Sequence, residues 1–150
     1  SFLYSLVMDT YSFGYSSSGF TDMPMNHKVF LAQFDAIKKL ASEGPCVMVG
    51  RCADYALSEY KDCFSVFVHA DTDWRINRLS QKHNKTAKEA KDMINKTDKS
   101  RSSYYNYYTN KKWGAASSYN LCVDSSKLGI DGAAKAIIQA IEIFDSIKNK

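Results

Sequence analysis

Four arginines in this sequence have the side-chain chemistry of a phosphate-binding site. Arg51 directly follows an apolar run at residues 46–50. Arg75 and Arg78 are three residues apart, a spacing that puts two side chains on the same face of a helix. Arg101 comes later, in a second polar stretch. A guanidinium group stays charged and bonds two oxygens at once, so arginines drawn from several elements favour a phosphate ligand.

The positive charge of the chain is concentrated around three of these arginines. Residues 75–112 contain 11 Lys or Arg and 3 Asp or Glu, a local balance of +8, whereas the whole chain has a net charge of +4. This asymmetry predicts an anionic ligand at 75–112. Two alternatives stay open for the same charges: a solvated helix face, and an RNA-binding patch formed by the interleaved Lys, Arg and Tyr of residues 96–112.

Length and composition define the class of protein. The chain has 150 residues, 45% of them hydrophobic, which is enough for a single domain, residues 1–150, with a buried core. No apolar run is long enough to span a bilayer. The four cysteines form no CxxC pair, so no metal site is predicted and a reducing cytoplasm is the expected location. Residue 1 is Ser and no signal segment follows it, so we expect the natural protein to begin upstream.

Apolar runs and helical periodicities alternate along the chain. Residues 1–26, rich in Ser, Gly and aromatic residues, are expected to form a flexible N-terminal segment. Three apolar runs predict strands, at 46–50, 64–69 and 119–123. Five helices are expected: from the Asn26 cap to Gly44-Pro45, over 53–60, from Asp71 or Thr72 to a polar break at 81–85, from a Thr86–Glu89 capping box through Arg101, and over about 131–147. The last of them is predicted to face the core with Ala134, Ile137, Ile138, Ile141 and Phe144.

This alternation of strands and helices indicates an α/β fold with a parallel sheet. In such sheets ligands gather at the carboxyl ends of the strands. Arg51, Asp71 and Asp124 all follow or end predicted strands. Asp71 could hold Mg²⁺ through water, although capping of the next helix is the favoured role. The sequence therefore places the ligand site at this edge of the sheet.

An ordered set of segments points to a known family. The set is GRCAD, VFVHADTDWRINRL, TAKEAKDMI, DKSRSSYYNYYTNKKWG and YNLCVDSSKLGID. In order and spacing it resembles the cytidylate kinase-like family of P-loop kinases over roughly residues 27–145. The resemblance implies a three-layer P-loop kinase-type parallel sheet with helices on both faces. It also implies a helical lid and return helix at about 75–112.

The resemblance implies roles for the arginines. In the family, arginines at the positions of Arg75 and Arg78 lie on the lid and approach the transferred phosphoryl group. The arginine at the position of Arg101 reaches the acceptor phosphate, so these three are the catalytic candidates. Arg51 would lie beside the acceptor nucleotide. Snorkelling into solvent, for Arg75 and Arg78, and a salt bridge to a carboxylate, for Arg51, are the corresponding structural interpretations.

Three further residues are candidates for substrate binding. Asp54 could orient Arg51 or bond the acceptor base, or could cap a helix. Asp98 belongs to an Asp-x-x-Arg pattern with Arg101, and the two could instead form only a surface pair on one helix. Tyr105 shares a face with Arg101 and is a candidate for stacking on a base or holding a phosphate, although packing is the favoured role.

One departure from the family is plain. Its glycine-rich phosphate loop has no counterpart here, because Ser17-Ser18-Gly19-Phe20 has no lysine and no preceding strand. We expect the first strand and this loop to lie upstream of residue 1. The alternative is a chain that lacks them and is not a self-sufficient kinase.

The resemblance implies an activity and its cofactors. The expected function is transfer of the terminal phosphoryl group of ATP, with Mg²⁺, to a nucleoside monophosphate such as CMP. The alternative is a non-catalytic nucleotide-binding or interaction module. Nucleotides are the expected partners, with no nucleic acid and no membrane, and the oligomeric state stays open.

Overall fold

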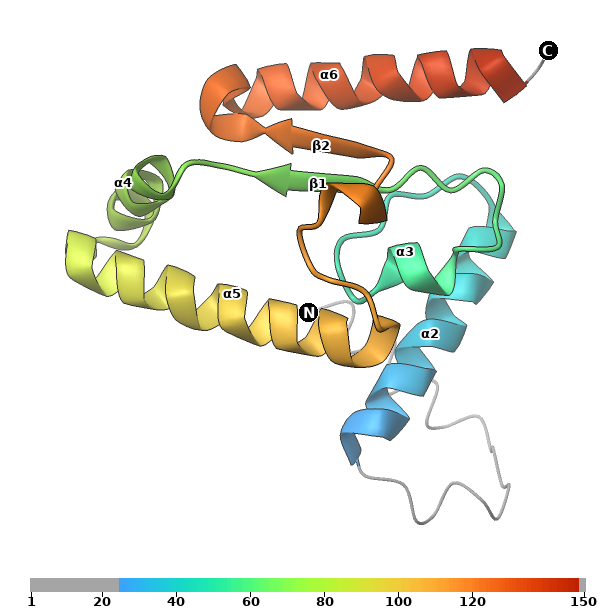
Figure 1. Cartoon of the computed structure of the whole chain (residues 1–150), viewed down its shortest axis with the longest axis horizontal. Helices are drawn as coiled ribbons and strands as arrows, with labels where there is room; N and C mark the ends of the chain where they lie inside the picture. Colours follow the sequence, from blue (N-terminus) through green and yellow to red (C-terminus); the bar gives the residue numbers. More distant parts are fainter. Residues whose placement is uncertain (1–24, 149–150) are drawn as a thin grey trace. The chain divides into compact units, whose positions relative to one another are not determined.

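The structure, a computed structural model, describes residues 25–148, so the predicted segment 1–26 lies almost wholly outside the described residues. The described chain divides into two compact units, residues 25–63 and 64–148. Each unit has its own elements, which Figure 1 shows in sequence colours.

The first unit is built on helix α2 (Met25–Glu43) and the short helix α3 (Ala53–Ala56). Helix α2 ends where the sequence predicts, because Gly44 has φ 148 and a proline follows. It begins at Met25, however, so Asn26 lies inside the helix rather than before it. Helix α3 is shorter than the predicted 53–60. A small core joins the two helices and contains Ile37, Ala53, Ala56 and Leu57, with Phe34, Ala41, Met48 and Cys63 packed against it.

The predicted strand at residues 46–50 is wrong. The segment is irregular, and among the residues that the structure describes it pairs with no strand. Val47 and Val49 are 94% and 87% exposed, whereas Met48 packs on the first unit's core. A strand exists only through hydrogen bonds to a neighbouring strand. The apolar sequence alone therefore does not make one here.

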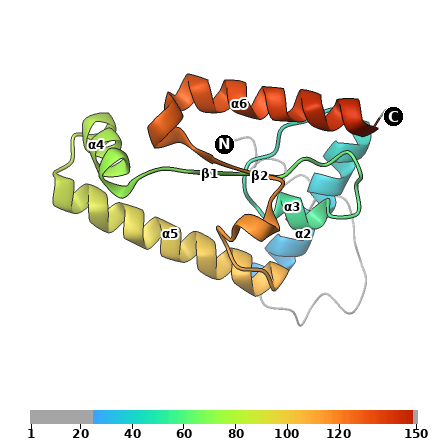
Figure 2. The same cartoon turned by 45° about the horizontal axis from the view of Figure 1, so that its top comes forward.

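The second unit contains a parallel pair of strands, β1 (Val66–His69) and β2 (Leu121–Asp124). Their register pairs Val66 with Leu121 and His69 with Asp124, so both strands end at the same edge. Figures 1 and 2 show α6 on one side of this pair and α5 on the other. The predicted strands at 64–69 and 119–123 are confirmed, with every end shifted by two residues or fewer. The arrangement is a mixed α/β fold around a small two-stranded parallel sheet.

Helices α4 (Thr72–His83) and α5 (Ala87–Thr109) follow β1 and pack on each other. Both begin at predicted caps. The Asp71 carboxylate accepts a hydrogen bond from the Asp73 backbone N–H at 2.9 Å, and Thr86 forms a complete capping box with Glu89. The predicted break at 81–85 is too early, because α4 continues to His83 and only then turns through a left-handed residue.

Helix α6 (Ser125–Lys148) returns along the sheet after a kink at Gly129, whose φ is 69. The predicted inward face is only partly correct. Phe144 packs on Phe64 with ring centroids 5.1 Å apart, and Ala133 is buried. Ile138 is 55% exposed, and Ala134 and Ile141 are exposed as well. The sheet has only two strands among the described residues, and these strands cover only part of the apolar face of α6.

An aromatic cluster fixes the segment between α5 and β2, which contains the one-turn helix η1 (Ala116–Ser118). The Phe67 ring of β1 packs on Trp113 at 5.3 Å and on Tyr119 at 5.0 Å. Gly114 has φ 75, and a Cβ there would lie 3.2 Å from the Phe67 ring. Only glycine combines this backbone with this close approach. None of the helices in the described range 25–148 is long and apolar enough to cross a membrane.

Candidate phosphate-binding site between α4 and α5

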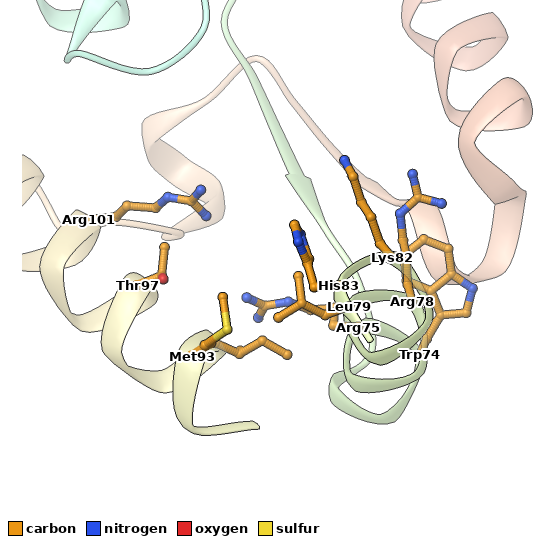
Figure 3. Close-up of a pocket in the computed structure, with 10 residues that line it drawn as sticks. Trp74, Arg75, Arg78, Leu79, Lys82, His83, Met93, Thr97 and Arg101 are labelled. Atoms are coloured by element: carbon orange, nitrogen blue, oxygen red, sulfur yellow. The ribbon is translucent and has the colours of Figure 1, made fainter. Parts of the chain in front are cut away.

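A pocket of about 390 Å³ lies between α4 and α5 in the second unit. Its volume is in the range of small-molecule sites. Figure 3 shows side chains from the two helices around it. Helix α4 contributes Trp74, Arg75, Arg78, Leu79, Lys82 and His83, and α5 contributes Met93, Ile94, Thr97 and Arg101. The three arginines predicted as catalytic therefore meet at one pocket.

Arg75 is held in place by Asp98 of α5. Its Nη1 lies 2.7 Å from Asp98 Oδ2, and its Nη2 donates a hydrogen bond of 2.9 Å to Oδ1. The two side chains are 31% and 25% exposed, so the pair is partly withdrawn from water. A fork-to-fork pair of this kind fixes the guanidinium plane. Arg75 thus joins the two walls of the pocket, and Asp98 compensates its charge.

The other two arginines are less constrained by acids. The Arg78 guanidinium lies 5.6 Å from the Trp74 ring centroid, a cation–π arrangement that restrains a long side chain without neutralising it. Arg101 lies 3.8 Å from Asp98 and is 63% exposed. Asp98 already forms a two-point ion pair with Arg75. The positive charge of Arg101 is therefore only weakly compensated and can interact with an anionic ligand. In Figure 3 Arg101 extends from the α5 side toward the α4 residues.

The pocket is strongly cationic as a whole. Among the described residues that line it there is no Asp or Glu, and the nearby Asp98 is paired with Arg75. Arg78, Lys82 and Arg101 therefore face a common space with little acidic compensation. Like charges gathered this closely repel one another unless an anion lies between them. The arrangement suits a ligand that carries several negative charges, such as a chain of phosphates.

Seven of the ten lining residues were not predicted as site residues, and Trp74, Lys82 and His83 are three of them. Lys82 and His83 fall in the predicted break at 81–85, and Trp74 lies on the predicted helix before it. The i, i+4 spacing from Trp74 to Arg78 and from Arg78 to Lys82 would have identified one continuous face. The sequence contains that spacing, but it places Lys82 on the same face as Arg78 only if the helix continues through residues 81–83, as α4 does.

Arg51 and Asp54 belong to the first unit. Arg51 occupies a tight turn in which the Ala53 N–H donates to the Gly50 carbonyl at 3.1 Å. The two central residues, Arg51 and Cys52, have φ 57 and 56. A left-handed backbone conformation costs a non-glycine residue about 1–2 kcal/mol. The turn is therefore strained at Arg51, the residue predicted to bind the acceptor nucleotide. Strain at an exposed arginine favours a functional role over chance.

Cys52 shows how closed this turn is on its inner side. Its side chain is 4% exposed. Burial, followed by the nearby Asp54 carboxylate, raises the pKa of the Cys52 thiol to about 11. The thiol therefore stays protonated at neutral pH and acts as a small apolar residue rather than as a nucleophile. Burial likewise raises the pKa of Cys63.

Polar side chains also lie at the carboxyl edge of the sheet. Asp124 accepts a short hydrogen bond from the Ser126 hydroxyl, and this bond is the main reason that the pKa of Asp124 is lowered. Ser126 in turn accepts from the Asp71 N–H at 3.1 Å. The cluster is internally satisfied. Within residues 25–148 no group of three His, Cys, Asp or Glu is placed to hold a metal ion.

Tyr105 lies on α5 beyond the pocket. It is 6% exposed, and its ring stacks on Tyr119 at 6.2 Å. The contact between Tyr105 and substrate stays a prediction, as do the individual roles of the other site residues. The structure gathers Arg75, Arg78, Asp98 and Arg101 around one pocket. Tyr105 is part of the adjoining core.

Comparison with known proteins gives the class of this chain. Residues 1–127 match the cytidylate kinase-like family, and the chain belongs to it. Membership gives the chain a kinase-like fold. The crystal structure of an uncharacterized protein from Eubacterium ventriosum ATCC 27560 is similar, with a TM-score of 0.80 and 29% sequence identity. The match covers 93% of this chain and 79% of that one. No protein of curated function matches.

Proposed function

We propose that this protein is a phosphotransferase that moves the terminal phosphoryl group of ATP to a nucleoside monophosphate, with CMP as the acceptor. The observation that carries the proposal is the cationic pocket between α4 and α5, lined by Arg75, Arg78 and Arg101. The family membership supports phosphoryl transfer as the reaction. The choice of CMP rests on the family alone.

The requirements of phosphoryl transfer match the positive charges that line the pocket. Phosphoryl transfer passes through a loose transition state with charge on three equatorial oxygens, so the protein mainly supplies position and positive charge. Arg78 and Arg101 approach from different helices and would bond oxygens of the transferred group from two sides. Arg75, held by Asp98, would keep the two helices at a fixed spacing. Charge placed in advance costs no reorganisation when the group moves.

The residues present fit the phosphates of ATP, because Arg78, Lys82 and Arg101 line the pocket and no Asp or Glu is among its described lining residues. Mg²⁺ bound to those phosphates would neutralise further charge when present. Protein-bound Mg²⁺ is usually held by substrate phosphates together with one or two carboxylates, so the phosphates themselves would be its main ligands.

The acceptor would be held by other residues. Arg51 and Asp54 are proposed to bind the nucleoside monophosphate, Arg51 through its phosphate and Asp54 through its base. Asp98 and Tyr105 are proposed as further acceptor contacts. The strained turn at Arg51 supports this role, because it presents a long cation on the outside of the turn.

A transfer assay with the full chain tests the proposal. ATP labelled in the terminal phosphate, Mg²⁺ and a panel of CMP, UMP, AMP and GMP are used as substrates. Arg101→Ala is expected to lower kcat by roughly 100-fold or more with the fold intact, the scale of losing one charge-stabilising donor. Lys99→Ala is the matched control, since Lys99 is an exposed cation of α5 that does not line the pocket.

Two results would overturn the proposal or part of it. ATP binding without transfer to any acceptor would favour a non-catalytic nucleotide-binding module. Equal turnover in Arg101→Ala and Lys99→Ala would remove Arg101 from the site.

A further inference from the structure

One side chain of the pocket is a histidine among permanently charged residues. His83 lines the space together with Arg78 and Lys82 of its own helix and Arg101 of α5. It is the last residue of α4, where the carbonyl end of the helix dipole favours a cation. Figure 3 shows its ring between the α4 and α5 side chains that surround the pocket. A titratable ring among permanent cations therefore faces the anion site.

We propose that His83 is an anion ligand of this pocket and that, in its protonated form, it tightens the hold on a bound phosphate group. The proposal rests on the proposed function for the identity of the ligand, but it requires only that an oxyanion enters the pocket. Neutral imidazole offers one N–H donor, whereas imidazolium offers two donors and a full charge.

The charges around His83 make its protonation and anion binding depend on each other. On α4 it shares the pocket with Arg75, Arg78 and Lys82, and on α5 with Arg101, while Asp98 is engaged by Arg75. A bound oxyanion is opposite in charge to imidazolium, so it interacts more favourably with the protonated ring than with neutral imidazole. By linkage, whatever factor protonation adds to anion affinity, the anion adds to proton affinity.

This coupling would distinguish His83 from the arginines functionally. The arginines and Lys82 keep their charge over the whole physiological range, so they provide binding that is constant with pH. His83 would add a component that is present when its ring is protonated and absent when the ring is neutral. Anion release would consequently become faster as the medium becomes more alkaline.

Inorganic sulfate is the probe for this proposal, because its charge stays constant from mildly acidic to alkaline pH while a phosphate ester titrates near pH 6. Sulfate is titrated into the full chain at about pH 5.5 and pH 8, followed by NMR of the histidine rings. The wild type is expected to bind roughly tenfold more tightly at the lower pH, and saturating sulfate to raise the pKa of His83 by roughly one unit.

Three variants complete the test. His83→Gln is expected to bind weakly and without pH dependence, and His83→Lys tightly and without pH dependence. His69→Gln is the matched control, since His69 is an exposed histidine at the end of β1 and does not line the pocket. It should retain the wild-type pH dependence.

The outcomes separate this inference from the proposed kinase activity. Sulfate binding that is lost in Arg101→Ala but is unchanged in His83→Gln at both pH values overturns the role of His83 and leaves the phosphate pocket standing. If sulfate raises the pKa of His83 in a protein that transfers no phosphoryl group, the role of His83 as an anion ligand is supported and the proposed kinase activity is overturned. Sulfate affinity that is equal in the wild type and Arg101→Ala overturns both.

Discussion

The ion pair between Arg75 and Asp98 is expected to hold the two walls of the pocket together, and a double-mutant cycle can measure how strongly. Its two contacts are 2.7 and 2.9 Å long, and the side chains are 31% and 25% exposed. Exposed pairs contribute about 0.2–1 kcal/mol, whereas breaking a fully buried pair costs about 3–5 kcal/mol. The partial burial and bidentate geometry place this pair between those limits. We expect a coupling free energy of about 2 kcal/mol.

The chain contains its own control for this measurement. Arg101 approaches the same carboxylate at 3.8 Å and is 63% exposed, so its coupling to Asp98 should be about 0.5 kcal/mol or less. The cycles compare Arg75→Met, Arg101→Met and Asp98→Asn with the corresponding double variants. Unfolding in urea gives each free energy. For a chain of this size, about 2 kcal/mol should also lower the Tm by roughly 4–8 °C.

The comparison of the two cycles tests whether burial and bidentate geometry strengthen the Arg75–Asp98 ion pair. If the coupling of Arg75 to Asp98 does not exceed that of Arg101 to Asp98, the reasoning from burial and bidentate geometry is refuted. The ion pair would then be a surface contact, and the spacing of α4 and α5 would depend on their apolar contacts.

Further predictions concern the caps and the strained turn. Thr86→Ala should destabilise the chain by about 1 kcal/mol in urea unfolding, and wild-type stability should fall as the pH drops through the lowered pKa of Glu89, because the ionised carboxylate accepts its two hydrogen bonds from Thr86 more strongly than the protonated acid. If acid lowers Thr86→Ala stability as steeply as wild type, the capping box is not the cause. In thiol labelling at pH 8 of the native chain, exposed Cys46 should react much faster than Cys52, whose pKa is about 11, and equal rates would mean that the turn opens readily. Arg51→Gly should leave stability unchanged or raise it by up to about 1 kcal/mol while raising the KM for the acceptor, and a large stability loss in urea unfolding would contradict the strain argument.

The elements that could be predicted from the sequence are those fixed by neighbours within a few residues. The Thr86–Glu89 box and the Asp71 cap are bonds between residues two or three apart, so their spacing is visible in the sequence. The end of α2 at Gly44 is equally local. The chemistry of the site was predictable for the same reason: arginine side chains carry their charge and geometry wherever they are placed.

The strand at 46–50 failed because pairing is not local. Its apolar run meets the sequence criteria for a buried strand, but only a neighbouring strand can satisfy its backbone, and the described residues provide none. The inward face of α6 failed in a similar way. Ile138 has the right helical spacing, yet a side chain is buried only where something covers it.

Asp98 separates most clearly what the sequence determines from what the fold decides. By itself, the sequence determined that Asp98 carries a charge, that it lies on a helix, and that Arg101 follows at the spacing of a helical pair. The tertiary structure decided which arginine it binds. Asp98 forms its close pair with Arg75, 23 residues away, at 2.7 Å, and keeps Arg101 at 3.8 Å. The packing of α4 on α5 creates this choice, because only the partner helix can bring a guanidinium into the partly buried position where an ion pair is strong.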